Sequence, residues 1–137
     1  MTSASRDALA REVWRAMAKL FVDGERRREV VERTGLSFAK TRLLRRLLDG
    51  PLAMGELAHS LNVDRPNLTT LVDSLESDQL VRRLPHPGDR RITMVEATAS
   101  GLAAARTAAE VLDRPPAELT SLSRTDLEML RRILTGP

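Results

Sequence analysis

Residues 64–95 read "DRPNLTTLVDSLESDQLVRRLPHPGDRRITMV", and this stretch decides the fold. Asp64 is a residue type that caps helix N-termini, and Pro66 is tolerated only in the first turn of a helix. From Leu68 to Leu75 the apolar residues recur at spacings of three, one and three, which is the pattern of one buried helix face. We therefore predict a helix whose polar side chains face outwards. These are Arg65, Asn67, Thr69, Thr70, Asp73 and Ser74.

A hairpin is predicted directly after this helix. The runs "LVRRL" (residues 80–84) and "ITMVEAT" (residues 92–98) are rich in apolar and β-branched residues, as short strands are. The segment "PHPGD" (residues 85–89) between them disfavours both helix and strand because of its prolines and glycine. The two strands and the loop that joins them are called the wing below.

A short helix is also predicted before Asp64. It carries Leu57, Ala58 and Leu61 on one side and ends at a break, Asn62-Val63. Two short helices joined by a turn of three to four residues form a helix-turn-helix, whose second helix is shaped to enter a major groove of DNA. A helix-turn-helix followed by a hairpin is a winged helix.

Helices are predicted on both sides of the winged helix. A helical stripe begins near Ser5 and extends towards residue 33, with Gly24 inside it, and further helices begin at Ser37, Thr98 and Ser123. The predicted fold class is mostly α with a small β-hairpin wing (α+β). The length suits one domain, residues 1–137. Within it, residues 36–98 form the winged helix-turn-helix, and 1–34 and 99–137 form terminal helices.

The composition excludes several classes of protein. With 42% hydrophobic and 30% charged residues, the chain is globular rather than disordered. The absence of cysteine excludes disulfides, thiol catalysis and thiolate metal sites. The apolar runs are too short to span a membrane, and charged residues interrupt the first twenty positions, unlike a signal peptide. We expect a cytoplasmic protein with no membrane partner.

The basic charge is almost entirely arginine. The net charge is only +3, but twenty of the twenty-two basic residues are arginine. They pair at 45–46, 82–83, 90–91 and 131–132, with a triplet at 26–28. The planar guanidinium donates paired hydrogen bonds to phosphates and base edges. For any single pair, however, a solvated helix face is an equally simple interpretation.

No pattern in the sequence indicates catalysis or metal binding. His59 and His86 are the only histidines, too few for a metal site, and we expect the first on a helix surface and the second packed in the wing. The seven glycines form no phosphate-binding pattern, and neither histidine has a nucleophile partner by motif. We therefore predict no enzyme activity, no catalytic residue, no metal and no cofactor.

Over nearly its whole length the chain resembles the MarR family of bacterial transcription regulators. The matching stretches are "GLSFAKTRLLRRL", "PLAMGELAHSL", "DRPNLTTLVDSLESDQLVRR", "HPGDRRITMV" and "TASG". The resemblance implies an obligate homodimer built by the terminal helices, with one winged helix per subunit on a pseudo-palindromic operator in double-stranded DNA. It implies a sequence-specific transcriptional regulator, most simply a repressor, released by a small-molecule effector.

The resemblance also implies roles for individual residues. The recognition-helix positions correspond to Arg65, Pro66, Asn67, Thr69 and Thr70. Asp89 would organise the wing by pairing with an arginine, and Arg90 or Arg91 would enter the minor groove. Two features depart from the family pattern. Thr70 and Ser74 stand where many members have basic residues, and Gln79 replaces a common glycine before the first wing strand.

Several assignments have alternatives. Asn67 can supplement the helix cap or contact adenine, and both roles can coexist. Ser37, Lys40 and Arg42 can touch phosphate, although capping and solvated charge explain them as simply. The residues Trp14, Met17 and Phe21 can line an effector pocket or belong to an ordinary core. The alternative function is a winged-helix RNA- or protein-binding module without operator recognition.

Overall fold

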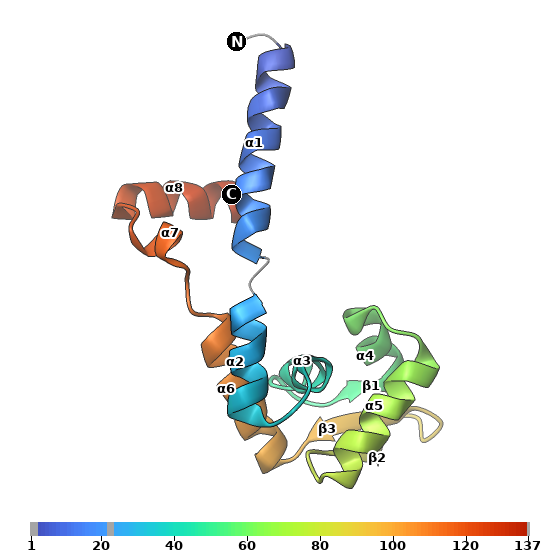
Figure 1. The fold of residues 1–137 in the computed structure, drawn as a ribbon. Helices are drawn as coiled ribbons and strands as arrows, with labels where there is room; N and C mark the ends of the chain where they lie inside the picture. Colours follow the sequence, from blue (N-terminus) through green and yellow to red (C-terminus); the bar gives the residue numbers. More distant parts are fainter. Residues whose placement is uncertain (1–2, 22–23, 137) are drawn as a thin grey trace. The chain divides into compact units, whose positions relative to one another are not determined.

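The computed structural model describes residues 3–21 and 24–136, which form two compact units. The winged-helix unit, Gly24–Leu112, contains eight of the described elements, and the terminal unit contains the other three (Figure 1). In the winged-helix unit these are α2 (Gly24–Thr34), α3 (Phe38–Arg46), β1 (Leu52–Ala53), α4 (Met54–Leu61), α5 (Arg65–Ser77), β2 (Val81–Pro85), β3 (Thr93–Ala97) and α6 (Ala99–Leu112). In the terminal unit they are α1 (Ser3–Phe21), α7 (Ala117–Thr120) and α8 (Arg124–Thr135).

The predicted fold class is confirmed: the described chain is mostly helical, with α4 and α5 forming the helix-turn-helix and β2 and β3 forming the wing. The hairpin runs from the pair Val81↔Ala97 to the pair Pro85↔Thr93. The sequence analysis missed β1, which pairs antiparallel with β3 and gives a small sheet of order β1-β3-β2. This strand has only two residues, and its partner lies some forty positions later in the chain.

The helix boundaries follow from capping chemistry. The side chains of Ser37, Asp64 and Ser123 each accept a hydrogen bond from the backbone N–H three residues ahead, which satisfies a donor left open in the first turn. Helix α4 ends at Asn62, whose left-handed φ of 54° turns the chain towards α5. Asparagine adopts this conformation more readily than most residues, so the predicted break at Asn62-Val63 is confirmed.

The core of the winged-helix unit fixes the position of α5. Leu68, Val72 and Leu75 are fully buried, as the apolar spacing predicted, while Leu71 lies at the edge of the core. They pack with a cluster contributed by α3, α4, β2, β3 and α6. Its main members are Leu43, Leu44, Leu47, Leu57, Leu61, Val81, Val95 and Ala105. Because one face of α5 is held in this way, its opposite face is presented to solvent.

Helix α6 packs against both α2 and α3. Val30 of α2 and Ala108 and Val111 of α6 form a second, smaller buried cluster. The helical stretch predicted from residue 5 towards 33 is two helices, α1 and α2, and Gly24 is the first residue of the second. The structure holds a single chain, so the assignment of residues 1–34 and 99–137 to a dimer interface stays a prediction.

The turn between α5 and β2 passes close to the start of α6. Thr98 caps α6 by accepting a hydrogen bond from the Gly101 N–H, and its hydroxyl donates to the carbonyl of Gln79. A Cβ at Gly101 would overlap the carbonyl oxygen of Leu80, so this crossing requires glycine. Gln79 has a φ of 61°, which explains why glycine is common at this position in the family pattern.

Within residues 3–21 and 24–136, no helix is both long enough and apolar enough to cross a membrane.

Candidate nucleic-acid interface

The outward face of α5 carries the polar residues that the sequence predicted. Arg65, Asn67, Thr69 and Thr70 are exposed, whereas Ser74 is half-buried. Pro66 lies in the first turn of the helix, where its missing N–H costs no hydrogen bond. The face therefore has one cation, Arg65, at the helix N-terminus, an uncharged polar stretch from Asn67 to Thr70, and two acidic residues, Asp73 and Glu76, in its C-terminal half.

Two side chains on this face are held by hydrogen bonds. The Asp64 carboxylate accepts from the backbone N–H of Asn67 at 2.8 Å and from the Asn67 Nδ2 at 3.0 Å. The Thr70 hydroxyl donates to the carbonyl of Pro66 at 3.1 Å. The capping role of Asn67 is therefore present in the structure, and its side chain has a defined orientation.

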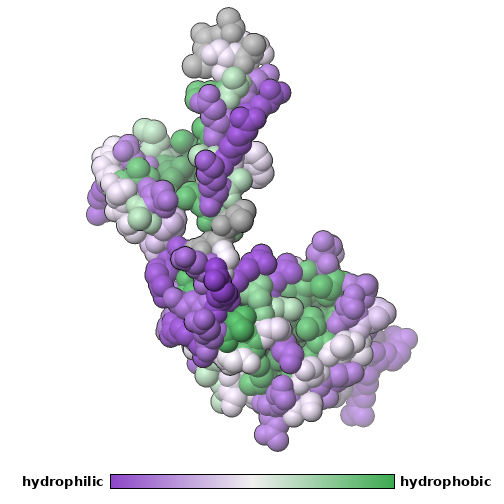
Figure 2. Space-filling view, viewed as in Figure 1, coloured by the Kyte–Doolittle hydropathy of each residue, from purple (hydrophilic) through white to green (hydrophobic). Residues whose placement is uncertain are grey.

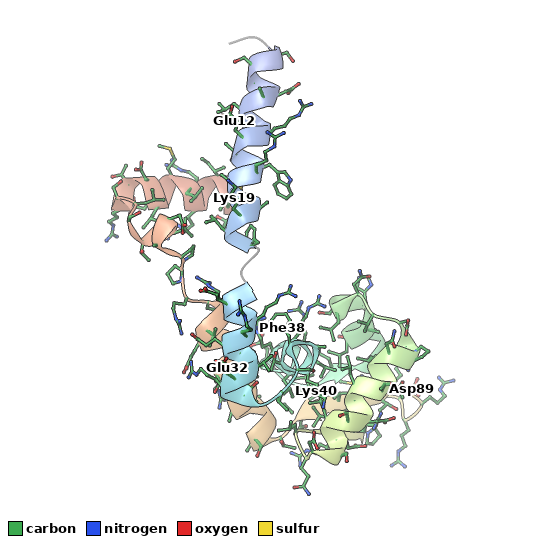
Figure 3. All side chains as sticks on the ribbon, viewed as in Figure 1. Glu12, Lys19, Glu32, Phe38, Lys40 and Asp89 are labelled. Carbon is green, nitrogen blue, oxygen red and sulfur yellow. The ribbon has the colours of Figure 1, made fainter. Side chains whose placement is uncertain are left out.

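The wing loop is organised by Asp89. Its carboxylate pairs with the Arg91 guanidinium through two contacts of 3.1 Å and also accepts from the Arg91 backbone N–H. The hydrogen bonds from the Arg91 side chain, and to a smaller extent the one from its backbone N–H, hold the pKa of the Asp89 carboxyl below its usual value. Figure 3 labels Asp89 in the loop beyond the end of the hairpin.

Arg90 differs from its neighbour. Among the described residues it has no hydrogen-bond or ion-pair partner, and it is exposed at the loop between β2 and β3. Next to it, the His86 Nδ1 accepts from the Gly88 N–H at 2.9 Å, so this histidine packs within the wing as expected. The loop of the wing thus has one arginine bound to Asp89 and one arginine that has no partner in the described chain. Figure 2 shows hydrophilic surface over this part of the unit.

Arg83 joins the wing to the recognition helix, a role that the sequence analysis did not find. Its guanidinium bonds to Asp73 at 2.6 Å and to Glu76 at 2.7 Å, and its backbone N–H donates to Glu76. Burial works to lower the Arg83 pKa, but hydrogen bonds and charge from the two carboxylates outweigh it and raise the pKa. The signal for this contact was two acidic residues three positions apart on the outward face of α5.

Arg65 and Arg91 line one surface hollow of about 370 Å³. The hollow is bounded by the first turn of α4, the start of α5 and the loop end of the wing. Glu56 is the acidic residue among those that line it, and a Cβ added at Gly55 would lie 3.8 Å from the Arg65 Nη1. The two arginines give this concave surface positive charge between the two elements expected to contact DNA.

The three residues considered for phosphate contact each have a partner within the chain. Ser37 caps α3, accepting from the Lys40 N–H at 3.3 Å. Lys40 lies 3.9 Å from the Asp78 carboxylate, and Arg42 donates to the carbonyl of Leu61 at the end of α4. Figure 3 shows Lys40 on α3, on the side towards α5. Their assignment to phosphate contact stays a prediction.

The residues considered for an effector pocket lie on α1. Trp14 and Phe21 are 68% and 76% exposed, and Met17 is half-buried. In the single chain Trp14 and Phe21 are therefore not core residues. Their assignment to an effector pocket stays a prediction. His59 lies exposed on α4, as expected, and no cluster of three candidate metal ligands occurs among the described residues.

Comparison with known proteins identifies the winged region. The family model described as the MarR family matches residues 36–93. The HTH-type transcriptional repressor NicR of Pseudomonas putida is 41% identical over 54 residues, which are 39% of this chain and 34% of that protein. The HTH-type transcriptional regulator Rv2034 of Mycobacterium tuberculosis is 43% identical over 65 residues, or 47% of this chain and 58% of that protein. The chain thus covers less than two thirds of either relative.

A solved structure extends the likeness to nearly the whole chain. The transcriptional regulator BldR from Sulfolobus solfataricus superposes with a TM-score of 0.66 at 27% sequence identity. The match covers 98% of this chain and 99% of that one.

Proposed function

This chain belongs to the MarR family through residues 36–93, and from this premise we propose that it is a sequence-specific DNA-binding transcription regulator. One observation carries the proposal: the polar face of α5 lies beside a wing whose Arg90 has no partner in the described chain. The relatives NicR and BldR are named a transcriptional repressor and a transcriptional regulator. A repressor that occludes a promoter is the form we favour, and this role would place the protein in the cytoplasm.

The two elements would read DNA in different ways. Helix α5 would enter the major groove, where each base pair presents a distinct pattern of donors and acceptors. The wing would lie over the adjacent minor groove, and a narrow A·T-rich groove attracts an inserted arginine through its negative potential. Of the two candidate arginines, Arg90 suits insertion better because Arg91 is held by Asp89.

Arg91 and Arg65 would instead contact the phosphate backbone. Both line the hollow of about 370 Å³ between α5 and the loop end of the wing, and guanidinium groups bind phosphate oxygens well. Arg91 would use the guanidinium hydrogens that are not donated to Asp89. Such contacts fix the register of the protein on DNA without reading the sequence. The ion pairs of Arg83 with Asp73 and Glu76 would keep α5 and the wing at a constant separation while both are bound.

We propose that the terminal helices form a homodimer. Leu9, Val13, Leu127 and Leu134 are between 38% and 58% exposed, and Ile133 is 69% exposed. Figure 2 shows hydrophobic surface on the unit that contains α1 and α8. Contiguous apolar surface of this kind marks a site of association. A two-fold dimer would place its recognition helices on half-sites about one helical turn apart.

Sedimentation equilibrium tests the dimer. We expect the full chain to sediment as a dimer and Leu134→Asp to shift it to monomer, because a carboxylate would be buried without a partner. A wild-type chain that stays monomeric at concentrations saturating for DNA would overturn this part of the proposal. An effector would act by favouring a dimer whose recognition-helix spacing no longer matches the operator, and Trp14, Met17 and Phe21 are the residues we propose for its pocket.

The proposed function is tested by selecting bound duplexes from a random DNA pool with the full-length wild-type chain. We expect an enriched, pseudo-palindromic motif with two half-sites about one turn apart. The nearly uncharged face at Thr69 and Thr70 supports the second candidate, an RNA- or protein-binding winged helix. Competition of the bound duplex with RNA of the same sequence separates the two functions. Preferential binding of the RNA, or no enriched DNA motif, would contradict the proposed function.

A further inference from the structure

The polarity of the Asn67 side chain can be assigned from its neighbour. A carboxylate has only acceptor oxygens at neutral pH, so the atom of the Asn67 amide that faces Asp64 must be the donor, Nδ2. The reversed amide would place Oδ1 against Oδ2 of Asp64, two acceptors with no proton between them. The observed contact of 3.0 Å from Nδ2 to Asp64 is the orientation that this chemistry requires.

The amide keeps two groups for an external partner. One hydrogen of Nδ2 is used on Asp64, which leaves the second hydrogen and the Oδ1 acceptor of Asn67. In the major groove adenine presents an N6 donor beside an N7 acceptor, which complements this pair of groups. Guanine presents acceptors at both positions, so its O6 would face Oδ1 unfavourably.

Thr70 adds a second acceptor one helical turn away. Its hydroxyl hydrogen is donated to the Pro66 carbonyl, so the Oγ1 lone pairs are what it presents outwards. Residues three apart lie on the same side of a helix, so Asn67 and Thr70 face one edge of the groove. Both therefore favour bases that carry an amino group.

We propose that Asp64 is a positioning residue for base recognition, which holds Asn67 so that it selects adenine in each half-site. This inference rests on the proposed function and deepens it by assigning the base read at one position. Asp64 carries a negative charge at a DNA-binding surface, which by itself weakens binding to every sequence. Its benefit lies in the fixed orientation of Asn67, since a side chain already held in its bound geometry loses less entropy on binding.

The test begins with the motif selected by the wild-type chain from the random duplex pool. Asn67→Ala identifies the position that Asn67 reads, where we expect adenine to be favoured over guanine by about 10-fold or more. Asp64→Ser is the informative variant. Serine can still cap α5 through the Asn67 backbone N–H, but it has no second oxygen to hold Nδ2. We expect this variant to lose preference for adenine at that one position, while its affinity for scrambled duplexes stays equal or rises.

Base analogues test the same contact without changing the protein. Replacing the adenine by 7-deazaadenine removes the N7 acceptor, and replacing it by unsubstituted purine removes the N6 amino group. Each should weaken wild-type binding several-fold, and neither should affect Asn67→Ala, whose fold is checked by its thermal melting profile.

The inference is overturned if Asn67→Ala relaxes no position, or if the relaxed position is a G·C pair, which offers no adenine on either strand. It is also overturned if Asp64→Ser keeps the full adenine preference, since Asp64 is then only a cap. A wild-type chain that selects no motif overturns the proposed function as well. That failure is recognisable before any variant is measured.

Discussion

The close crossing of α6 and the α5–β2 turn predicts opposite effects for two glycine-to-alanine substitutions. At Gly101 a Cβ would overlap the Leu80 carbonyl oxygen and lie 3.3 Å from Leu44 Cδ2. The start of α6 must then move by about 1 Å to restore normal contact. We estimate about 1–3 kcal/mol for overpacking and about 1 kcal/mol for weakening the Thr98 N–H to Leu80 hydrogen bond, which is 3.0 Å long. The better helix propensity of alanine offsets up to about 1 kcal/mol.

The net expectation for Gly101→Ala is a loss of about 1–4 kcal/mol in the free energy of unfolding. The matched control is Gly55→Ala, also inside a helix, where the added Cβ would lie 3.8 Å from the Arg65 Nη1, an ordinary contact. We expect this control to gain about 0.5 kcal/mol from helix propensity. Urea unfolding followed by far-UV circular dichroism, at one protein concentration, measures both changes. Equal effects of the two substitutions would refute the crossing as the reason for glycine at 101.

Three further predictions concern the recognition helix and the wing. Gln79→Gly should stabilise the chain by about 0.5–1 kcal/mol in the same unfolding experiment, because it removes a side chain from a left-handed φ of 61°; a loss of stability would contradict this. Arg83→Ala should lower the free energy of unfolding by about 1–2 kcal/mol because it removes the link between β2 and α5. Its control, Arg82→Ala, removes the same charge from a more exposed ion pair and should lower it by less than about 1 kcal/mol. Equal losses would argue against the link. Asp89→Ala should weaken DNA binding at neutral pH although it removes a negative charge, and a rise in affinity would exclude Asp89 as the wing organiser. The folded-state pKa of Asp89 is lowered, so its ion pair with Arg91 is complete above the ordinary carboxyl pKa and is lost only as pH falls through the lowered value. A titration of wild-type DNA affinity should therefore show no transition from Asp89 between about pH 6 and 8.

The winged helix could be predicted because its signals are local. The cap at Asp64, the apolar spacing from Leu68 to Leu75 and the turn residues of the wing each act within a few positions. Strand β1 could not be found in this way, because Leu52 is a strand residue only through its pairing with Val95. A two-residue segment carries too little local preference to be recognised before its partner is known.

The residues of the candidate site were predicted as positions, but their mutual contacts were not. From the sequence, Arg90 and Arg91 were equally good candidates for the arginine that enters the minor groove. The contacts of Asp89 with Arg91 distinguish them. The link from Arg83 to α5 depends on how a strand packs beside a helix, which no spacing along the chain reveals. The need for glycine at 101 likewise arises from a turn that lies about twenty positions away in sequence.

The salt dependence of DNA affinity for Arg90→Ala tests most directly whether the wing reaches DNA. Each phosphate-equivalent contact contributes about 0.9 to the slope of log affinity against log salt, so removing one cation from each subunit of a dimer should lower the slope by about 2. Affinity should fall alike on selected and scrambled duplexes, because the wing contributes binding independent of base contacts. Arg124→Ala, which removes an equal charge from α8, is the matched control and should leave the slope unchanged. An Arg90→Ala chain that keeps wild-type affinity and slope would contradict the account, since the wing would then make no contact with DNA.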